Sequence, residues 1–268
     1  MDTVSSMTYA PETLAPYRRR PSVQARRMLH RLIDPVRSWP QYVRAAQTLA
    51  NLPDGPYRAP VNVPYVAQFA SPDLIYAYIH EHLHGRDDPN WLDFGIDDPD
   101  TYTFWAHRAC AIACLKMAID GFSTSTPLTM WELVDQGIAL GGYRTHDETG
   151  TFIDEGWYYP ALVKLAEAHG LEVRGMGYVS TLDVCTAIRE GWLVAAAVTP
   201  DLGERGRLRR YDGHFVVVYE FAWSGGRMRN VTLHNPSGRY PELRAGAIIP
   251  ARRFARAFAH RFLALRPA

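Results

Sequence analysis

The chain is 268 residues long, 47% hydrophobic, and carries a formal net charge of +1. This length allows one substantial hydrophobic core or two modest ones. A charge so close to zero gives no reason to expect a nucleic acid or an acidic membrane surface as partner. No apolar run has the length of a membrane span, and no secretory signal is visible at the start. Three cysteines do not make a disulfide scaffold, so we expect a cytoplasmic protein.

The first part of the chain, residues 1–57, is basic and contains several prolines, and we expect it to form an N-terminal helical lead-in. Helices are predicted over Ala25–Ile33 and Pro40–Leu49. The turn sequence Pro53–Pro56 then marks a boundary. Residues 58–268 are expected to form the main domain. We interpret the arginine clusters of the lead-in as a solvated helix face.

The middle of the chain alternates between helical and strand patterns. The stretch Val61–Phe69 alternates as a short strand does, Asp87–Thr101 has the composition of a loop, and Trp192–Val198 reads as a buried strand. A long apolar helix follows Tyr102 and ends at Gly121. The other predicted helices are Leu74–His82, Thr129–Leu140, Trp157–His169 and Thr181–Glu190.

Cys110 is the candidate nucleophile, because it stands where the long apolar helix is expected to begin. The positive end of a helix macrodipole favours a thiolate over a thiol. Cys114 lies one turn further into the same helix, and Cys185 lies within another predicted helix. We interpret both of these as small buried hydrophobic residues.

A predicted hairpin supplies a base for this thiol. Phe215–Phe221 is the clearest strand in the sequence, and a second alternating run, Met228–His234, follows a glycine-containing turn. With the turn centred between Ser224 and Gly225, His214 lies opposite Asn235. Directly paired residues hold their Cβ atoms about 4.5–5.5 Å apart. Asn235 is therefore expected to orient the His214 ring so that its other nitrogen faces Cys110.

The order of these motifs resembles the double-glycine, bacteriocin-processing peptidase-like family of papain-like cysteine peptidases. The resemblance covers roughly residues 60–265. It rests on the segments Val63–Gln68, Cys110–Met117, Gly191–Val194, Gly213–Val218 and Asn235–Pro236.

The resemblance implies a papain-like α+β fold, in which a helical part with the nucleophile helix packs against an antiparallel sheet carrying the His and Asn. It implies Cys110 as nucleophile, His214 as general base and Asn235 as the residue that orients the base. Gln68, together with the backbone N–H of Cys110, would form the oxyanion hole. No cofactor and no metal are implied.

This chain departs from the family pattern at three positions. Ala111 replaces the usual glycine after the cysteine, and Asn235 replaces the usual aspartate. Gln68 stands about forty residues before Cys110, further away than in the peptidase domains themselves.

These residues indicate a cysteine-dependent acyl-transfer enzyme of the peptidase or amidase type, acting through a thioester on a peptide or amide substrate. The same triad would serve an amide-forming acyltransferase, and a non-catalytic papain-like binding protein is a third possibility. A metal protein centred on His80, His82 and His84 is a fourth, although alternate histidines share a face only on a strand. The sequence does not indicate an oligomeric state.

Overall fold

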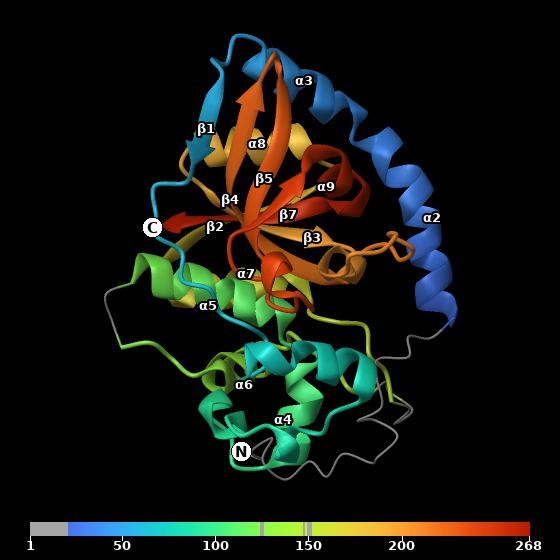
Figure 1. Ribbon diagram of the computed structural model, residues 1–268, viewed down its shortest axis with the longest axis vertical. Helices are drawn as coiled ribbons and strands as arrows, with labels where there is room; N and C mark the ends of the chain where they lie inside the picture. Colours follow the sequence, from blue (N-terminus) through green and yellow to red (C-terminus); the bar gives the residue numbers. More distant parts are fainter. Residues whose placement is uncertain (1–20, 124–125, 147, 149–151) are drawn as a thin grey trace.

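A seven-stranded antiparallel sheet forms the centre of the computed structural model, which describes residues 21–123, 126–146, 148 and 152–268 (Figure 1). The strands follow the order β2-β7-β3-β4-β5-β6, and β1 pairs with the far half of β4. Their bounds are β1 Gly55–Arg58, β2 Leu171–Gly177, β3 Leu193–Val198, β4 His214–Ser224, β5 Arg227–His234, β6 Ala247–Pro250 and β7 Phe258–Pro267.

Helices cover both faces of this sheet and form a separate layer beyond one of them. Figure 1 shows α4 and α6 furthest from the sheet and α2 along one side of the molecule. The helices are α2 Pro21–Arg37, α3 Trp39–Leu49, α4 Pro99–Ala106, α5 Cys110–Phe122, α6 Met130–Ala139, α7 Tyr159–Ala168, α8 Thr181–Arg189 and α9 Ala251–Ala257. Short 3-10 or π turns are Pro72–Leu74, Ala77–Glu81, Gly85–Asp87, Trp91–Phe94, Pro200–Gly203 and Pro241–Leu243.

The alternation of side chains along β3 divides the hydrophobic core into two clusters. Leu193 and Ala195 contribute to the cluster that contains α5, α6 and α7. Val194 and Ala196 contribute to the cluster on the other face, which contains α8 and α9. Successive side chains of a strand point to opposite faces, so a continuous apolar run is what a strand covered on both sides requires.

The β4–β5 hairpin carries two irregularities that the sequence pattern did not predict. Its turn lies at Gly225 and Gly226, which both have positive φ, and the ladder shifts between Val218 and Glu220 and again near Trp223. The predicted turn centre between Ser224 and Gly225 is therefore wrong, and so is the predicted register. Glycine accepts positive φ without steric cost, so the turn falls on the glycine pair.

The N-terminal helices are packed onto the sheet. The expected boundary after residue 57 falls inside β1, where Tyr57 pairs with Phe221 of β4. Leu49 of α3 is fully buried in the same cluster as α8. The first twenty residues, which include Arg18–Arg20, lie outside the described residues.

The predicted α+β class with an antiparallel sheet is confirmed, as are β3 and both hairpin strands. The predicted strand over Val61–Phe69 is wrong: the segment is irregular, and it carries Pro64, which has no N–H to donate to a ladder. The expected loop Asp87–Thr101 instead contains short helical turns and the start of α4. The sequence patterns missed β1, β2, β6, α9 and β7.

Truncation of Leu49 tests whether the N-terminal helices and the sheet unfold together. We expect Leu49→Ala to lower the free energy of unfolding by about 2–5 kcal/mol, since the side chain is fully buried. The matched control, Leu32→Ala, truncates a side chain that is 74% exposed. It should change the free energy of unfolding by less than about 0.5 kcal/mol. Urea titration followed by circular dichroism measures both; equal stability of Leu49→Ala and wild type would contradict the packing.

Candidate active site

A cavity of about 560 Å³ lies where the start of α5 meets the start of β4. Cys110, His214 and Gln68 all line it, so residues more than a hundred positions apart in sequence share one space. Asn235 does not line the cavity but contacts His214 from behind. The cavity therefore brings together three of the four residues selected from the sequence, and the fourth, Asn235, contacts one of them.

Cys110 is the first residue of α5, as the sequence predicts. The preceding helix ends at Ala106, and a short connection turns the chain before α5 begins. Two side chains hold this connection: the amide of Gln68 donates to the carbonyl of Ala106 at 2.9 Å, and the indole of Trp157 donates to the carbonyl of Arg108 at 2.9 Å. The start of α5 is thereby fixed against the cavity, where the positive end of its dipole favours a negative charge.

The three thiols have different surroundings. Cys110 is partly exposed, whereas Cys114 and Cys185 are fully buried. Burial raises the pKa of the Cys114 thiol well above its usual value, and Cys110 nearby adds to the effect. Burial likewise raises the pKa of Cys185. Because the thiolate is the nucleophile, these two thiols are held in the unreactive form.

His214 is the first residue of β4, and a tight turn leads into it. Asp212 and Gly213 have φ values of 58° and 96°, a left-handed pair that reverses the chain before the strand. On the strand, His214 pairs with Val198 of β3 and its side chain is buried. The imidazole Nε2 lies 2.8 Å from Oδ1 of Asn235.

The backbone identifies which atom of the Asn235 amide faces the histidine. The N–H of Ser237 donates to Asn235 Oδ1 at 3.1 Å, so that atom must be the oxygen. His214 Nε2 therefore carries the proton that Oδ1 accepts, and in the neutral ring Nδ1 is left with a lone pair. This is the tautomer in which a histidine can accept a proton at Nδ1.

The contact between His214 and Asn235 does not arise from the predicted strand register. The ladder pairs Val217 with His234, and β5 ends there. Asn235 is the first residue of the loop that follows, and its backbone N–H donates to the carbonyl of Arg244 at 2.9 Å. The loop that folds back beyond the hairpin thus places Asn235.

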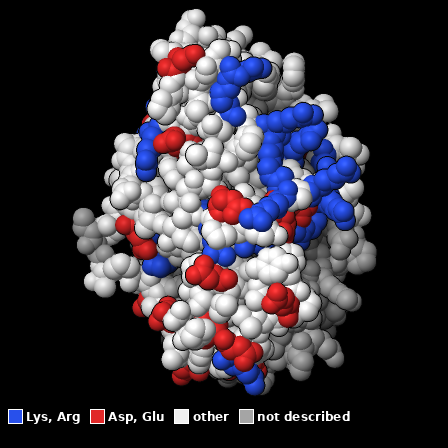
Figure 2. Space-filling model, viewed as in Figure 1, with Lys and Arg blue, Asp and Glu red and all other residues white. Residues whose placement is uncertain are grey.

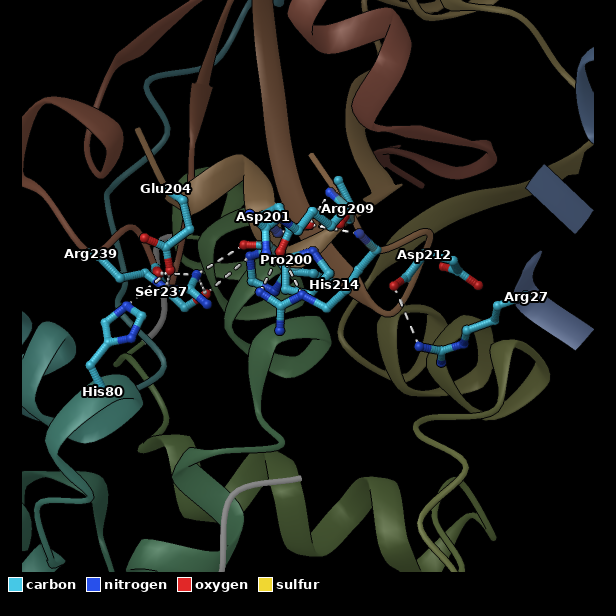
Figure 3. A network of polar contacts seen from close by, with 12 residues as sticks. Arg27, His80, Pro200, Asp201, Glu204, Arg209, Asp212, His214, Ser237 and Arg239 are labelled. Carbon is cyan, nitrogen blue, oxygen red and sulfur yellow. Dashed lines mark hydrogen bonds and ion pairs between the residues drawn. The ribbon is translucent and has the colours of Figure 1, made fainter. Parts of the chain in front are cut away.

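Ser237 and Arg239 are further site residues, which the sequence patterns missed (Figure 3). Ser237 Oγ lies 3.2 Å from His214 Nε2, and Arg239 donates to the Ser237 carbonyl at 2.9 Å. Arg239 also pairs with Glu204 at 3.0 Å, and Glu204 in turn with His80 at 3.0 Å. A chain of polar contacts therefore runs from the surface to the histidine.

Glycine at position 238 is the one sequence signal that marks this loop. A Cβ there would lie 2.1 Å from the carbonyl oxygen of Leu243, so no larger residue fits without moving the backbone. The close approach allows Arg244 to donate to the Gly238 carbonyl at 3.0 Å. These contacts join the two ends of the loop, and Asn235 and Ser237 lie at one of these ends.

Gln68 lies close to the start of α5 even though it is 42 positions before Cys110. Its backbone N–H donates to the carbonyl of Pro236 at 2.9 Å, which ties this segment to the loop of Asn235. Its amide nitrogen uses one proton on Ala106 and has a second to offer. Within the described part of the chain, its Oε1 is buried with no hydrogen-bond partner.

The three alternate histidines do not converge on one site. His80 pairs with Glu204 at 3.0 Å and His84 with Asp100 at 3.0 Å. His82 has φ 59° and ends the π turn, so the three do not share a helix face. Among the described residues, no group of three or more His, Cys, Asp or Glu side chains is arranged to hold a metal.

Comparisons with known proteins give matches among solved structures. No family model matches the chain, and no curated protein matches it. The peptidase domain of Streptococcus ComA, a bifunctional ABC transporter of a quorum-sensing pathway, is 14% identical with a TM-score of 0.40, over 60% of this chain and 93% of that one.

Two further solved structures are similar to this chain. A double-glycine motif protease from an AMS/PCAT transporter, solved with its leader peptide, is 18% identical with a TM-score of 0.35, over 59% of this chain and 84% of that one. The peptidase domain of Streptococcus mutans ComA is 17% identical with a TM-score of 0.28, over 50% of this chain and 92% of that one. Each of the three is described as a peptidase domain or a protease. A search of the described helices for one long and apolar enough to cross a membrane finds none.

Alkylation will distinguish the three thiols. We expect iodoacetamide at pH 7.5 to label Cys110 at least about 100-fold faster than Cys114 or Cys185 in the folded protein, because burial keeps the other two protonated and covered. Peptide mass mapping over time measures the three rates. Cys110→Ser should abolish the fast reaction, and urea should make all three thiols reactive. Equal slow labelling of all three thiols in the folded protein would contradict this assignment.

His107 predicts a loss of stability in acid. Burial, with Arg108 and His82 nearby, lowers the pKa of this histidine from 6.5 to about 3. Below pH 6.5 this histidine is therefore protonated in the unfolded chain but stays neutral in the folded chain. The free energy of unfolding then falls as the pH drops towards 3. We expect His107→Gln to reduce the pH dependence of the free energy of unfolding by up to about 1.4 kcal/mol per pH unit. Urea titrations of both proteins at pH 4 to 7 measure it; parallel losses would exclude His107 as the cause.

Proposed function

We propose that this chain is a papain-like cysteine enzyme that cleaves or transfers the acyl group of a peptide or amide. The observation that carries the proposal is the fixed tautomer of His214. Its Nε2 proton is engaged by Asn235, so Nδ1 is the ring nitrogen assigned as base, and His214 lines the same cavity as Cys110.

The reaction begins with deprotonation of Cys110 by His214. The resulting thiolate attacks the substrate carbonyl, and the carbon–sulfur bond forms as the carbonyl oxygen takes up negative charge. His214 then donates its proton to the leaving nitrogen, the carbon–nitrogen bond breaks, and a thioester remains on Cys110. Attack by water gives a peptidase or amidase, and attack by an amine gives an acyltransferase.

Gln68 is proposed as the oxyanion donor. One of its amide protons is held by the carbonyl of Ala106, at the end of the helix before Cys110. The second belongs to a side chain that lines the same cavity as the thiol. A donor aimed at the developing oxyanion lowers the barrier by about 3–4 kcal/mol. The backbone N–H of Cys110 is the second donor in this proposal.

Asn235 supplies orientation without charge. Its oxygen accepts from both His214 Nε2 and the Ser237 N–H, so the amide has one stable arrangement. Aspartate at this position would accept the same two hydrogen bonds and add a negative charge. The neutral amide therefore keeps the ring in place and leaves the imidazolium less stabilised.

Kinetics of site variants will test the assignment. With a panel of fluorogenic peptide amides, we expect Cys110→Ala and His214→Ala to lower kcat/KM at least about 10³-fold. Gln68→Ala should lower it by about 10²–10³-fold, and Asn235→Ala by about 10²-fold. Asn235→Asp, which keeps both acceptor bonds, should stay within about tenfold of wild type.

Intact-mass spectrometry with quenched samples should detect the acyl group on wild type and not on Cys110→Ala. The ratio of hydrolysis product to transfer product in the presence of an added amino acid amide separates the two outcomes of the thioester, because an acyltransferase site favours the amine over water. Turnover that persists in Cys110→Ala would overturn the proposal. Complete lack of turnover and of acylation in wild type would favour the non-catalytic binding protein.

A further inference from the structure

Helix α2 presents hydrophobic side chains to the solvent. Met28, Leu29, Leu32 and Val36 are 55%, 56%, 74% and 73% exposed. Met28, Leu32 and Val36 are four residues apart, so they form one stripe along the helix. Trp39, at the start of α3, is 62% exposed and continues the stripe in sequence.

The side of α2 that faces the protein is polar. Asp34 accepts a hydrogen bond from the hydroxyl of Tyr211 at 2.9 Å, and Arg31 donates to the carbonyl of Arg209 at 3.2 Å. Arg37 donates to the hydroxyl of Tyr178 at 2.8 Å. A surface helix normally turns its apolar stripe towards the core and its charges outward. Helix α2 reverses this pattern, so its outer stripe is not explained by the packing of the residues that the structure describes.

The exposed hydrophobic residues of the protein concentrate on this pair of helices. In the described part of the chain, seven of the twelve exposed large hydrophobic side chains belong to α2 and α3. Single exposed hydrophobic residues are ordinary, but a contiguous stripe marks an interaction surface.

The charges around the stripe are almost all positive. Helices α2 and α3 contain the arginines Arg26, Arg27, Arg31, Arg37 and Arg44. Their one acidic residue, Asp34, is buried and already bonded to Tyr211. The net charge of +1 for the whole chain conceals this local excess.

Further arginines lie on the same side of the molecule. Figure 2 shows basic side chains gathered on the side where Figure 1 places α2 and α9. The neighbouring loop joins this surface to α2, because Arg31 and Arg27 bond to the carbonyls of Arg209 and Asp212. The loop and α9 contribute Arg207, Arg209, Arg252 and Arg256 to this side, whereas Arg205 and Arg210 are already paired with Glu242 and Asp201.

We propose that the α2–α3 surface lies on an anionic membrane, with the stripe of Met28, Leu29, Leu32, Val36 and Trp39 in the lipid interface. A helix with an apolar stripe, flanking arginines and an aromatic residue is the form that binds in the plane of a bilayer. Arginines beside it meet acidic headgroups. A second copy of this chain would instead bring arginine against arginine, which disfavours association through the same face.

Membrane docking also bears on the cavity, because α2 contributes to both. Arg26, Arg27 and His30 of α2 line the cavity, while the stripe lies on the outer side of the helix. A protein docked through this stripe holds its cavity next to the bilayer. The proposal does not depend on the chemistry proposed for Cys110.

Co-flotation of the full-length protein with vesicles tests the proposal. We expect wild type to bind vesicles of phosphatidylcholine and phosphatidylglycerol (3:1) at least about tenfold more tightly than pure phosphatidylcholine, because the arginines need acidic headgroups. The double variant Leu32→Glu/Val36→Glu should lose at least about tenfold in binding to the anionic vesicles.

The matched control is Leu92→Glu/Ile248→Glu, which changes side chains of similar exposure, 60% and 67%, elsewhere on the surface. This control should bind as wild type does, and circular dichroism checks that both variants fold. Absence of wild-type flotation with anionic vesicles, or equal flotation of the stripe variant, would overturn the proposal. Light scattering that finds a dimer abolished by the stripe variant would assign the surface to a second copy instead.

Discussion

Burial of α5 against the sheet is the constraint on which the rest of the structure depends. Eight of its 13 residues are buried, and the helix contacts the strands β4, β3 and β7 and the helices α6 and α7. This packing fixes the direction of the helix, and its first residue, Cys110, lines the cavity at the start of β4. The position of the thiol in the cavity that His214 also lines is thus a result of core packing, and the positive end of the helix dipole acts on it there.

The sequence was most informative where structure is set locally. Helix α6 has a capping box of Thr129 and Glu132, and β3 and β4 are dense in apolar residues, so their positions were predictable. The position of β2 was not predictable, because its sequence contains two glycines and two charged residues and has no clear alternation of apolar and polar side chains. It is a strand because it pairs with β7. Pairing between strands that are distant in sequence depends on the partner strand, so the sequence of one strand alone gives little indication of it.

The candidate site shows the same division between local and distant information. Cys110 and His214 begin elements whose patterns are visible in sequence, so both could be selected from the residues. Asn235 was selected from a register that the hairpin does not have, since the glycine turn and the ladder shifts change the pairing. Its contact with His214 comes from a loop held by Gly238, and Ser237 belongs to that same loop. Only the folded loop reveals these partners.

Helix α2 lies between the cavity and the outer surface, with its polar face turned inward and its hydrophobic face turned outward. Its inward arginines and His30 would be poorly placed against an apolar core, but they suit a cavity with polar lining such as Asp212 and hydrogen bonds to the backbone of the neighbouring loop. Once the polar face is committed to that cavity, the hydrophobic face must point outward. Water alone would oppose such a stripe, since exposed apolar area costs free energy. In our proposal the stripe is a consequence of placing one helix between the candidate-site cavity and an apolar surface outside the protein.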